Sequence, residues 1–281
     1  MSGAAERSSP AGGGVGGADG GASPPTPSSA APPLRPPSAA TSPKGEETGL
    51  VSLALASGIV LAWALIHLYG VFAWRPDGAA SLVAAVILIP LQTWLSVGLF
   101  IISHDAIHGS LAPGRPRVNR AYGWLVMTLY AGFDYDKLAR SHAAHHDAPG
   151  TADDPDFSAD HPTHGLRWAR QFFTHHFGLR PLIFVHAVVF TYWLVLGASM
   201  VNIFLFYGVP ALTSAAQLFY FGTFRPHRHA DDAFADAHNA RSDRMPRALA
   251  LLTCYNFGGY HHEHHLYPGE PWWRLPRRRL T

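Results

Sequence analysis

The sequence predicts an all-α integral membrane protein in which four transmembrane helices form two hairpins and a cytoplasmic helical cap holds a histidine-rich metal site. Two observations favour this fold class. Only 14% of the 281 residues are charged, whereas about 25% is usual in soluble globular domains. Long apolar segments also alternate with short clusters of histidine, a residue that occurs 18 times.

The chain is expected to divide into a tail, residues 1–48, and one membrane-embedded domain, residues 49–281. The tail is rich in Ala, Gly, Pro and Ser and has almost no large apolar side chains. A segment of this composition buries too little surface to offset its ordering entropy, so we expect it to be disordered. It has no hydrophobic region of the kind found in a cleavable secretory signal.

Four apolar spans are expected in the remaining chain. Leu50–Trp74 and Gly78–Ser103 contain no Asp, Glu, Lys or Arg. Each is long enough to cross a hydrocarbon core about 30 Å thick at about 1.5 Å per residue. Pro181–Phe224 also lacks these residues, and Gly208-Val-Pro210 is expected to divide it into two spans. The apolar segment 121–133 is too short to cross, so it should lie at the interface or against the bundle.

The basic residues predict the orientation of these spans. Of the 21 Lys and Arg residues, 17 lie in segments 104–180 and 225–281, whereas only Arg75 lies in a hairpin turn. Because positive residues accumulate in cytoplasmic loops, both termini and the histidine clusters are expected to be cytoplasmic. The net charge of +2 gives no reason to expect nucleic-acid binding.

Three histidine clusters occur where spans are expected to end. They read "HDAIH", "HAAHH" and "HHEHH", with offsets of i, i+4 in the first and i, i+3, i+4 in the others. On an α-helix these offsets place side chains on one face. The eight histidines in this pattern are His104, His108, His142, His145, His146, His261, His264 and His265.

Eight imidazoles exceed the four ligands of one tetrahedral metal, so the clusters predict two metal ions. Imidazole suits iron, zinc and copper. Cys254 is the only cysteine, which excludes a disulfide framework and any cysteine-rich metal site. A His-rich tract that binds metal loosely would not need the same helical offsets at three separate positions.

The sequence resembles the membrane fatty acid desaturase and hydroxylase superfamily over residues 50–276, and within it most closely the bacterial β-carotene ketolases. The stretches that carry the resemblance are "SHDAIHGSLAP", "FDYDKLARSHAAHHDAPGTADDPDF", "LFYFGTFRPHRH", "DAHNARS" and "LLTCYNFGGYHHEHHLYPGEPWWRLP". The resemblance implies that the eight histidines hold a non-haem di-iron centre. It also implies one further histidine ligand, for which His227 is favoured over His238. Asn256 stands where many similar ketolases have a histidine.

Metal-bound histidines usually donate their second ring N–H to a carboxylate or carbonyl. Carboxylates near the clusters are therefore candidates to accept this hydrogen bond and orient the imidazoles. Those expected in this role are Asp105, Asp156 and Glu263. Asp153 and Asp154 are equally well explained by turn formation around Pro155. His262 should face away from its neighbours on a helix, and the pair Trp272-Trp273 should anchor the chain at the membrane interface.

The resemblance implies an oxygenase that converts C4 of the β-ionone rings of β-carotene to a ketone through echinenone to canthaxanthin, by two hydroxylations and a dehydration. It further implies two iron ions, O₂ as cosubstrate, a carotenoid that enters from the bilayer of the bacterial inner membrane, and electrons from a ferredoxin-type partner. Two rival functions remain open. One is a carotenoid hydroxylase or acyl-lipid desaturase of the same superfamily. The other is a membrane metal-binding or transport protein, although transporters usually carry ionisable residues inside their spans.

Overall fold

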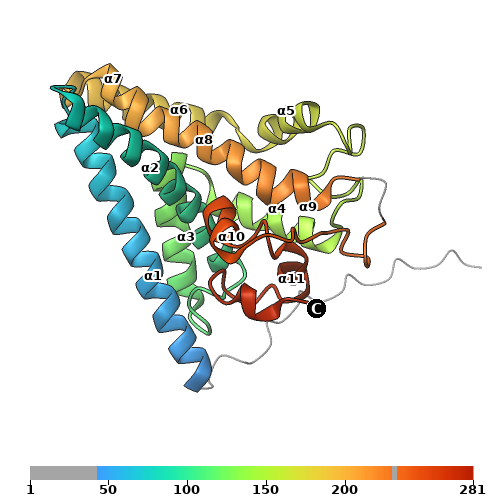
Figure 1. Ribbon diagram of the computed structural model, residues 1–281. Helices are drawn as coiled ribbons and strands as arrows, with labels where there is room; N and C mark the ends of the chain where they lie inside the picture. Colours follow the sequence, from blue (N-terminus) through green and yellow to red (C-terminus); the bar gives the residue numbers. More distant parts are fainter. Residues whose placement is uncertain (1–42, 230–232, 281) are drawn as a thin grey trace, which may run out of the picture. The chain divides into compact units, whose positions relative to one another are not determined.

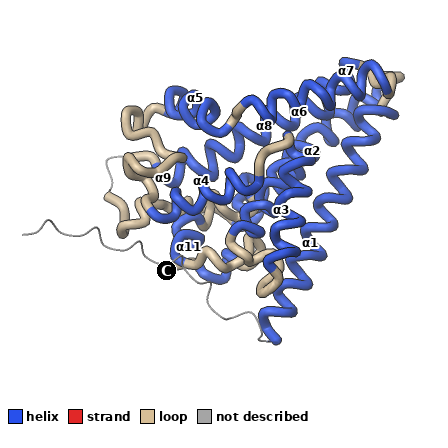
Figure 2. Tube along the Cα trace, turned by 180° about the vertical axis from the view of Figure 1, so that it is seen from behind, coloured by secondary structure: helices blue, strands red, loops and turns tan. Residues whose placement is uncertain are grey.

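The computed structural model describes residues 43–229 and 233–280, and these residues form helices and loops without a strand (Figures 1 and 2). The predicted disordered tail lies outside the described residues as far as residue 42. The longer elements are α1 (Pro43–Leu68), α2 (Ala79–Ile107), α3 (Pro116–Ala131), α4 (Tyr135–Asp147), α5 (Gly165–His176), α6 (Leu179–Phe190), α8 (Val209–Leu218), α10 (Arg247–Cys254) and α11 (His261–Leu266). The α-helical turns α7 (Met200–Ile203) and α9 (Arg225–His227) and the π-helical turns η2 (Tyr69–Ala73), η3 (Thr191–Val195), η4 (Phe204–Gly208) and η5 (Phe219–Phe224) complete the spans.

The first helix begins at Pro43 and includes residues 43–48, the end of the segment that was expected to be disordered. Glu46 lies in the first turn of α1, where a negative charge interacts favourably with the helix dipole. Thr48 is buried and accepts a hydrogen bond from Arg274 Nη1 at 2.7 Å. One turn later, Ser52 Oγ accepts from Trp273 Nε1 at 3.0 Å. Contacts with a segment more than 200 residues away therefore order a stretch whose local composition favours disorder.

Three continuous helical stretches are long and apolar enough to cross a membrane, namely Gly45–Ala73, Ala79–Ile107 and Met200–His227. A fourth span is formed only if α5 and the stretch Leu179–Val195 are counted together, because the two are bent by 81°. The first two spans agree with the predicted first hairpin. The predicted count of four depends on how the bent pair is placed relative to the bilayer.

The break between the last two apolar stretches lies at residues 196–199, so the prediction that Gly208-Val-Pro210 divides them is wrong. Gly197 adopts a left-handed conformation with φ of +69°, which ends the preceding helix. The Ser199 side chain accepts a hydrogen bond from Val201 N–H and so caps the start of α7. Pro210 instead continues the helix, because the π-helical turn η4 directly precedes it.

The turns of the two hairpins pack against each other at the end of the bundle that carries α7 (Figure 1). The buried Asn202 side chain donates to Trp74 O at 2.9 Å and to Val71 O at 3.3 Å. Phe206 is fully buried against Val71 and Trp74. The amide of Asn202 therefore satisfies backbone carbonyls that the end of the first span leaves without a helical partner.

The remaining helices lie between the other ends of the spans and position the histidines (Figures 1 and 2). Helix α3, the short apolar segment of the sequence, packs along α2 through Val126 and Met127. Gly132, with φ of +68°, ends α3, and Asp134 then caps α4 by accepting from Lys137 N–H at 3.0 Å. Helix α10 is held against the spans, because Trp94 Nε1 donates to Leu251 O at 3.1 Å.

Candidate metal centre

Four segments of the chain bring their histidines to one place. The end of α2 carries the first cluster, α4 the second and α11 the third, while α9 adds His227 at the end of the last span. The imidazoles fall into two groups, in each of which one ligand nitrogen per residue lies within 4.8 Å of all the others. Each of the two three-histidine clusters is shared between the groups.

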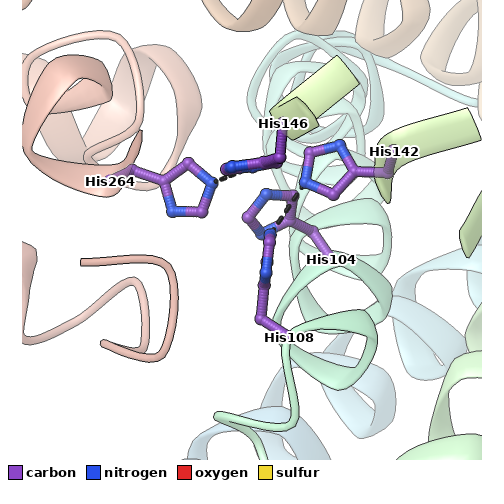
Figure 3. A group of neighbouring side chains, drawn as sticks. All are labelled: His104, His108, His142, His146 and His264. Atoms are coloured by element: carbon purple, nitrogen blue, oxygen red, sulfur yellow. Dashed lines mark hydrogen bonds between the residues drawn. The ribbon is translucent and has the colours of Figure 1, made fainter. Parts of the chain in front are cut away.

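The five-imidazole group consists of His104, His108, His142, His146 and His264 (Figure 3). His108 Nε2 lies 2.8 Å from His142 Nε2, and His146 Nε2 lies 3.0 Å from His264 Nε2. The ring of His104 is centred 4.5 Å from the rings of both His142 and His264. Five imidazoles from three remote segments therefore point toward one another.

The four-imidazole group consists of His145, His227, His261 and His265, all of which are buried. His261 Nε2 lies 2.9 Å from His227 Nε2 and 3.2 Å from His265 Nε2. The ring of His145 is centred 4.7 Å from that of His227. The rings of His146 and His265, one from each group, stack with centroids 4.4 Å apart, so the two groups are direct neighbours.

The donor set fits two resident metal ions. Two ligands that are each about 2.1 Å from one metal lie about 3 Å apart when they meet at a right angle. The four Nε2–Nε2 separations, between 2.8 and 3.2 Å, agree with this geometry. Burial, together with neighbouring imidazoles, lowers the pKa of His142 and His264 well below the usual range and that of His146 to about 2. Neutral imidazole is the form that binds metal.

Two imidazoles of the four-imidazole group are oriented by a hydrogen bond at Nδ1, the ring nitrogen that faces away from the group. His145 Nδ1 lies 2.9 Å from Asp154 Oδ2, which also accepts from Gly150 N–H. Burial lowers the pKa of His145, but the hydrogen bond with Asp154 and the charge of Asp156 outweigh burial and raise it. His227 Nδ1 lies 2.8 Å from Asn239 O. With Nδ1 occupied, Nε2 of each ring is left to face the group.

None of the three carboxylates predicted to orient the imidazoles makes a hydrogen bond with a histidine of the two groups. Asp105 accepts from Trp272 N–H at 3.1 Å, and its carboxylate is 3.7 Å from His104 Nδ1. Asp156 lies 2.7 Å from His176 Nε2.

Glu263 accepts from the Ser242 hydroxyl and from Leu280 N–H, because the α11 helix turns it away from the imidazole groups. Asp154, which the sequence leaves undecided, holds His145. Its place in "DDPD", nine residues after His145, is the only sequence signal for this contact, and it does not distinguish Asp154 from Asp153.

The structure also separates the two candidates for the additional ligand. His227 lies in the four-imidazole group, whereas His238 lies in a separate group with Asp236 and His262. Asn256 points elsewhere, since its side chain donates to Trp272 O at 3.1 Å. That these histidines are metal ligands stays a prediction; nine of them meet in two adjacent groups, each of which could hold a metal ion.

Comparison with known proteins agrees with this arrangement. The family model described as "Fatty acid desaturase" matches residues 78–194 and 157–280. Two β-carotene ketolases from strains of Paracoccus are 48% identical to this chain, over 83% and 86% of its length and 93% and 97% of theirs. A zeaxanthin 4-ketolase from Chlamydomonas reinhardtii is 34% identical over 82% of this chain and 53% of its own length. The chain thus belongs to the fatty acid desaturase family, in the group that contains the β-carotene ketolases.

Proposed function

We propose that this chain is an oxygenase that converts C4 of the β-ionone rings of β-carotene to a ketone, by way of echinenone to canthaxanthin. The observation that carries the proposal is the pair of adjacent imidazole groups in a chain 48% identical to two β-carotene ketolases over more than nine-tenths of their length. The zeaxanthin 4-ketolase among the relatives supports the same ring position.

Two iron ions held by the two groups would supply the activation of O₂, which no amino-acid side chain can perform. Each ring methylene becomes a ketone by two hydroxylations at the same carbon followed by loss of water. The balance for one ring is two O₂, four electrons and four protons consumed and three water molecules formed. We infer that the electrons come from a partner protein of the ferredoxin type.

The protein's own contribution is to hold neutral imidazoles in place and to keep the centre dry. Phe257 packs on the rings of His104 and His264, at centroid distances of 4.5 and 5.0 Å. Trp272 N–H satisfies the buried carboxylate of Asp105 beside the first cluster. Exclusion of water around the centre would limit reaction of activated oxygen with water or with side chains.

The substrate is insoluble in water, so we propose that it enters from the bilayer. The apolar spans support this, because their outer faces expose large side chains such as Leu61, Val86 and Leu212. The concentration of arginines near the imidazole groups supports a location of the centre on the cytoplasmic side of a bacterial inner membrane.

Pigment analysis tests the activity. Cells that make β-carotene and express this chain should accumulate echinenone and canthaxanthin, whereas cells that express a His261→Ala/His264→Ala/His265→Ala variant should not. His164→Ala is a suitable control, because this exposed histidine lies outside both groups. Zeaxanthin as the only product would favour a carotenoid hydroxylase, and unchanged β-carotene with new fatty acid double bonds would favour a desaturase. Two tightly held irons per chain would exclude a zinc transporter.

Labelling with a membrane-impermeant maleimide tests the orientation. The native Cys254 is buried and should not react. Asp77→Cys, in the exposed turn before α2, should react in intact cells, whereas Thr151→Cys, in the exposed loop after α4, should react only after the membrane is opened. The reverse pattern would overturn the proposed orientation.

A further inference from the structure

A third cluster of possible metal ligands lies outside the two imidazole groups. It consists of Asp236 and His238, in the loop before α10, and His262 of α11. His262 is the one histidine of its cluster that α11 turns away from the centre. One ligand atom from each of the three residues lies within 4.8 Å of the other two.

The carboxylate of Asp236 lies between the two imidazoles. Its Oδ1 is 3.1 Å from His238 Nδ1, and its Oδ2 is 2.8 Å from His262 Nε2. The backbone N–H of His238 also donates to Asp236 Oδ1, at 2.9 Å, which fixes the loop around the carboxylate. These hydrogen bonds hold the three side chains close to one another.

Two imidazoles and one carboxylate form a donor set that binds Zn²⁺, Fe²⁺ and Co²⁺. Three protein ligands leave positions for water, and Asp236 is exposed while His238 and His262 are only partly buried. An ion held here would therefore exchange with solvent far more readily than one held by the buried four-imidazole group.

The cluster lies between solvent and the four-imidazole group. Asp236 is exposed, so an ion can reach its carboxylate directly from solvent. Of the three residues, only His262 lines the neighbouring groove of about 820 Å³, whose wall carries Arg244 and Arg279. On the other side, the ring of His238 is centred 6.1 Å from that of His265, a member of the four-imidazole group.

From this geometry we infer that Asp236, His238 and His262 form a third metal site, which takes up one divalent ion from solvent and passes it to the four-imidazole group. The transfer rests on the metal binding proposed for the four-imidazole group, whereas binding at the third site needs only Asp236, His238 and His262.

Metal titration tests the binding. Full-length protein purified in detergent with iron in both imidazole groups is titrated with Co²⁺, and binding is followed by its visible absorption and by equilibrium dialysis. The wild-type chain should bind one additional equivalent, and Asp236→Asn and His238→Gln should each weaken that binding by at least about tenfold. His164→Ala should bind as the wild-type chain does. Absence of the additional equivalent, or its persistence in both variants, would overturn the site.

Iron loading tests the transfer. Protein stripped of metal by a chelator is mixed with a low concentration of radioactive Fe²⁺, and the bound iron is counted over time. Asp236→Asn should load more slowly than the wild-type chain but reach the same content of tightly bound iron, counted after exchangeable iron has been removed by gel filtration. Equal loading rates would overturn the transfer. The readouts are metal contents, so a failure of ketone formation in cells leaves this test interpretable.

Discussion

The two imidazole groups differ in how the protein holds them, although they share the helices α4 and α11. The four-imidazole group is buried throughout, and two of its rings are fixed from behind by Asp154 and by Asn239 O. In the five-imidazole group, three of the five histidines are only partly buried. Buried Nδ1 atoms without a hydrogen-bond partner among the described residues occur in both groups, at His104 and His264 in one and at His261 and His265 in the other. The four-imidazole group thus has fewer ligands, two of which are oriented by a hydrogen bond at Nδ1, whereas the five-imidazole group has one ligand more.

Removal of one ligand from each group gives the sharpest test of this difference. His227→Ala leaves three imidazoles in its group, so iron content should fall from about two to about one per chain, and ketone formation by at least about a hundredfold. His146→Ala leaves four imidazoles in the five-imidazole group and should retain both irons. Equal loss of iron in the two variants, measured by elemental analysis, would remove the distinction.

Loss of the partner of His145 should have the next largest effect. Asp154→Asn keeps the shape of the side chain but removes the charge that orients the imidazole, so iron affinity should fall by about 10–100-fold. The matched control is Asp153→Asn, because Asp153 is exposed beside it. Iron dissociation in the presence of a chelator measures both. If Asp154→Asn held iron as tightly as Asp153→Asn, the hydrogen bond between Asp154 and His145 would not contribute to metal affinity in this group.

A change at the far end of the bundle should alter stability without altering the metals. Asn202→Ala leaves the carbonyls of Trp74 and Val71 without the partner that they have in the structure. The cost should be about 1–3 kcal/mol, seen as a lower midpoint of thermal unfolding in detergent. Iron content per folded chain should not change. A variant that lost iron would show that the hairpin turns and the centre are coupled.

The smallest expected effect concerns the start of α4. Asp134→Ala removes the helix cap and should lower stability by about 1 kcal/mol. The Lys137 N–H and the nearby Arg180 hold the pKa of Asp134 below its ordinary value of 3.8.

Because the folded-state pKa is the lower one, the stabilisation is complete above the unfolded pKa and is lost as the pH falls through the folded pKa. The difference in unfolding midpoint between wild type and Asp134→Ala should therefore stay constant from about pH 7 to about pH 5 and shrink below about pH 4. A difference that stayed constant at lower pH would show that the carboxylate charge is not involved.

The sequence predicted those parts of the fold and site that depend on local patterns. Uncharged stretches are sufficient to find the first two spans, and the helical offsets of the histidines are sufficient to find eight of the nine residues in the two groups. The offsets do not reveal how each cluster is divided. In α4, His142 and His146 face one group and His145 the other, because adjacent residues on a helix point in different directions.

Features that depend on distant contacts were not predictable. The order of residues 43–48 involves a contact with Arg274. The break before α7 lies at Gly197, which has a left-handed backbone, and not at Pro210. The conformation of the loop after α4 determines which carboxylate contacts His145. Asp154 faces His145, whereas Asp156 faces His176.

The short segment Trp272–Arg274 contacts two regions that are far apart in the sequence. One is Asp105 beside the first histidine cluster, and the other is the opening turns of α1 at Thr48 and Ser52. Any bulky insertion at this segment would disturb both the first apolar span and the first histidine cluster. Engineering of the enzyme for new pigments should therefore leave these three residues untouched and begin elsewhere.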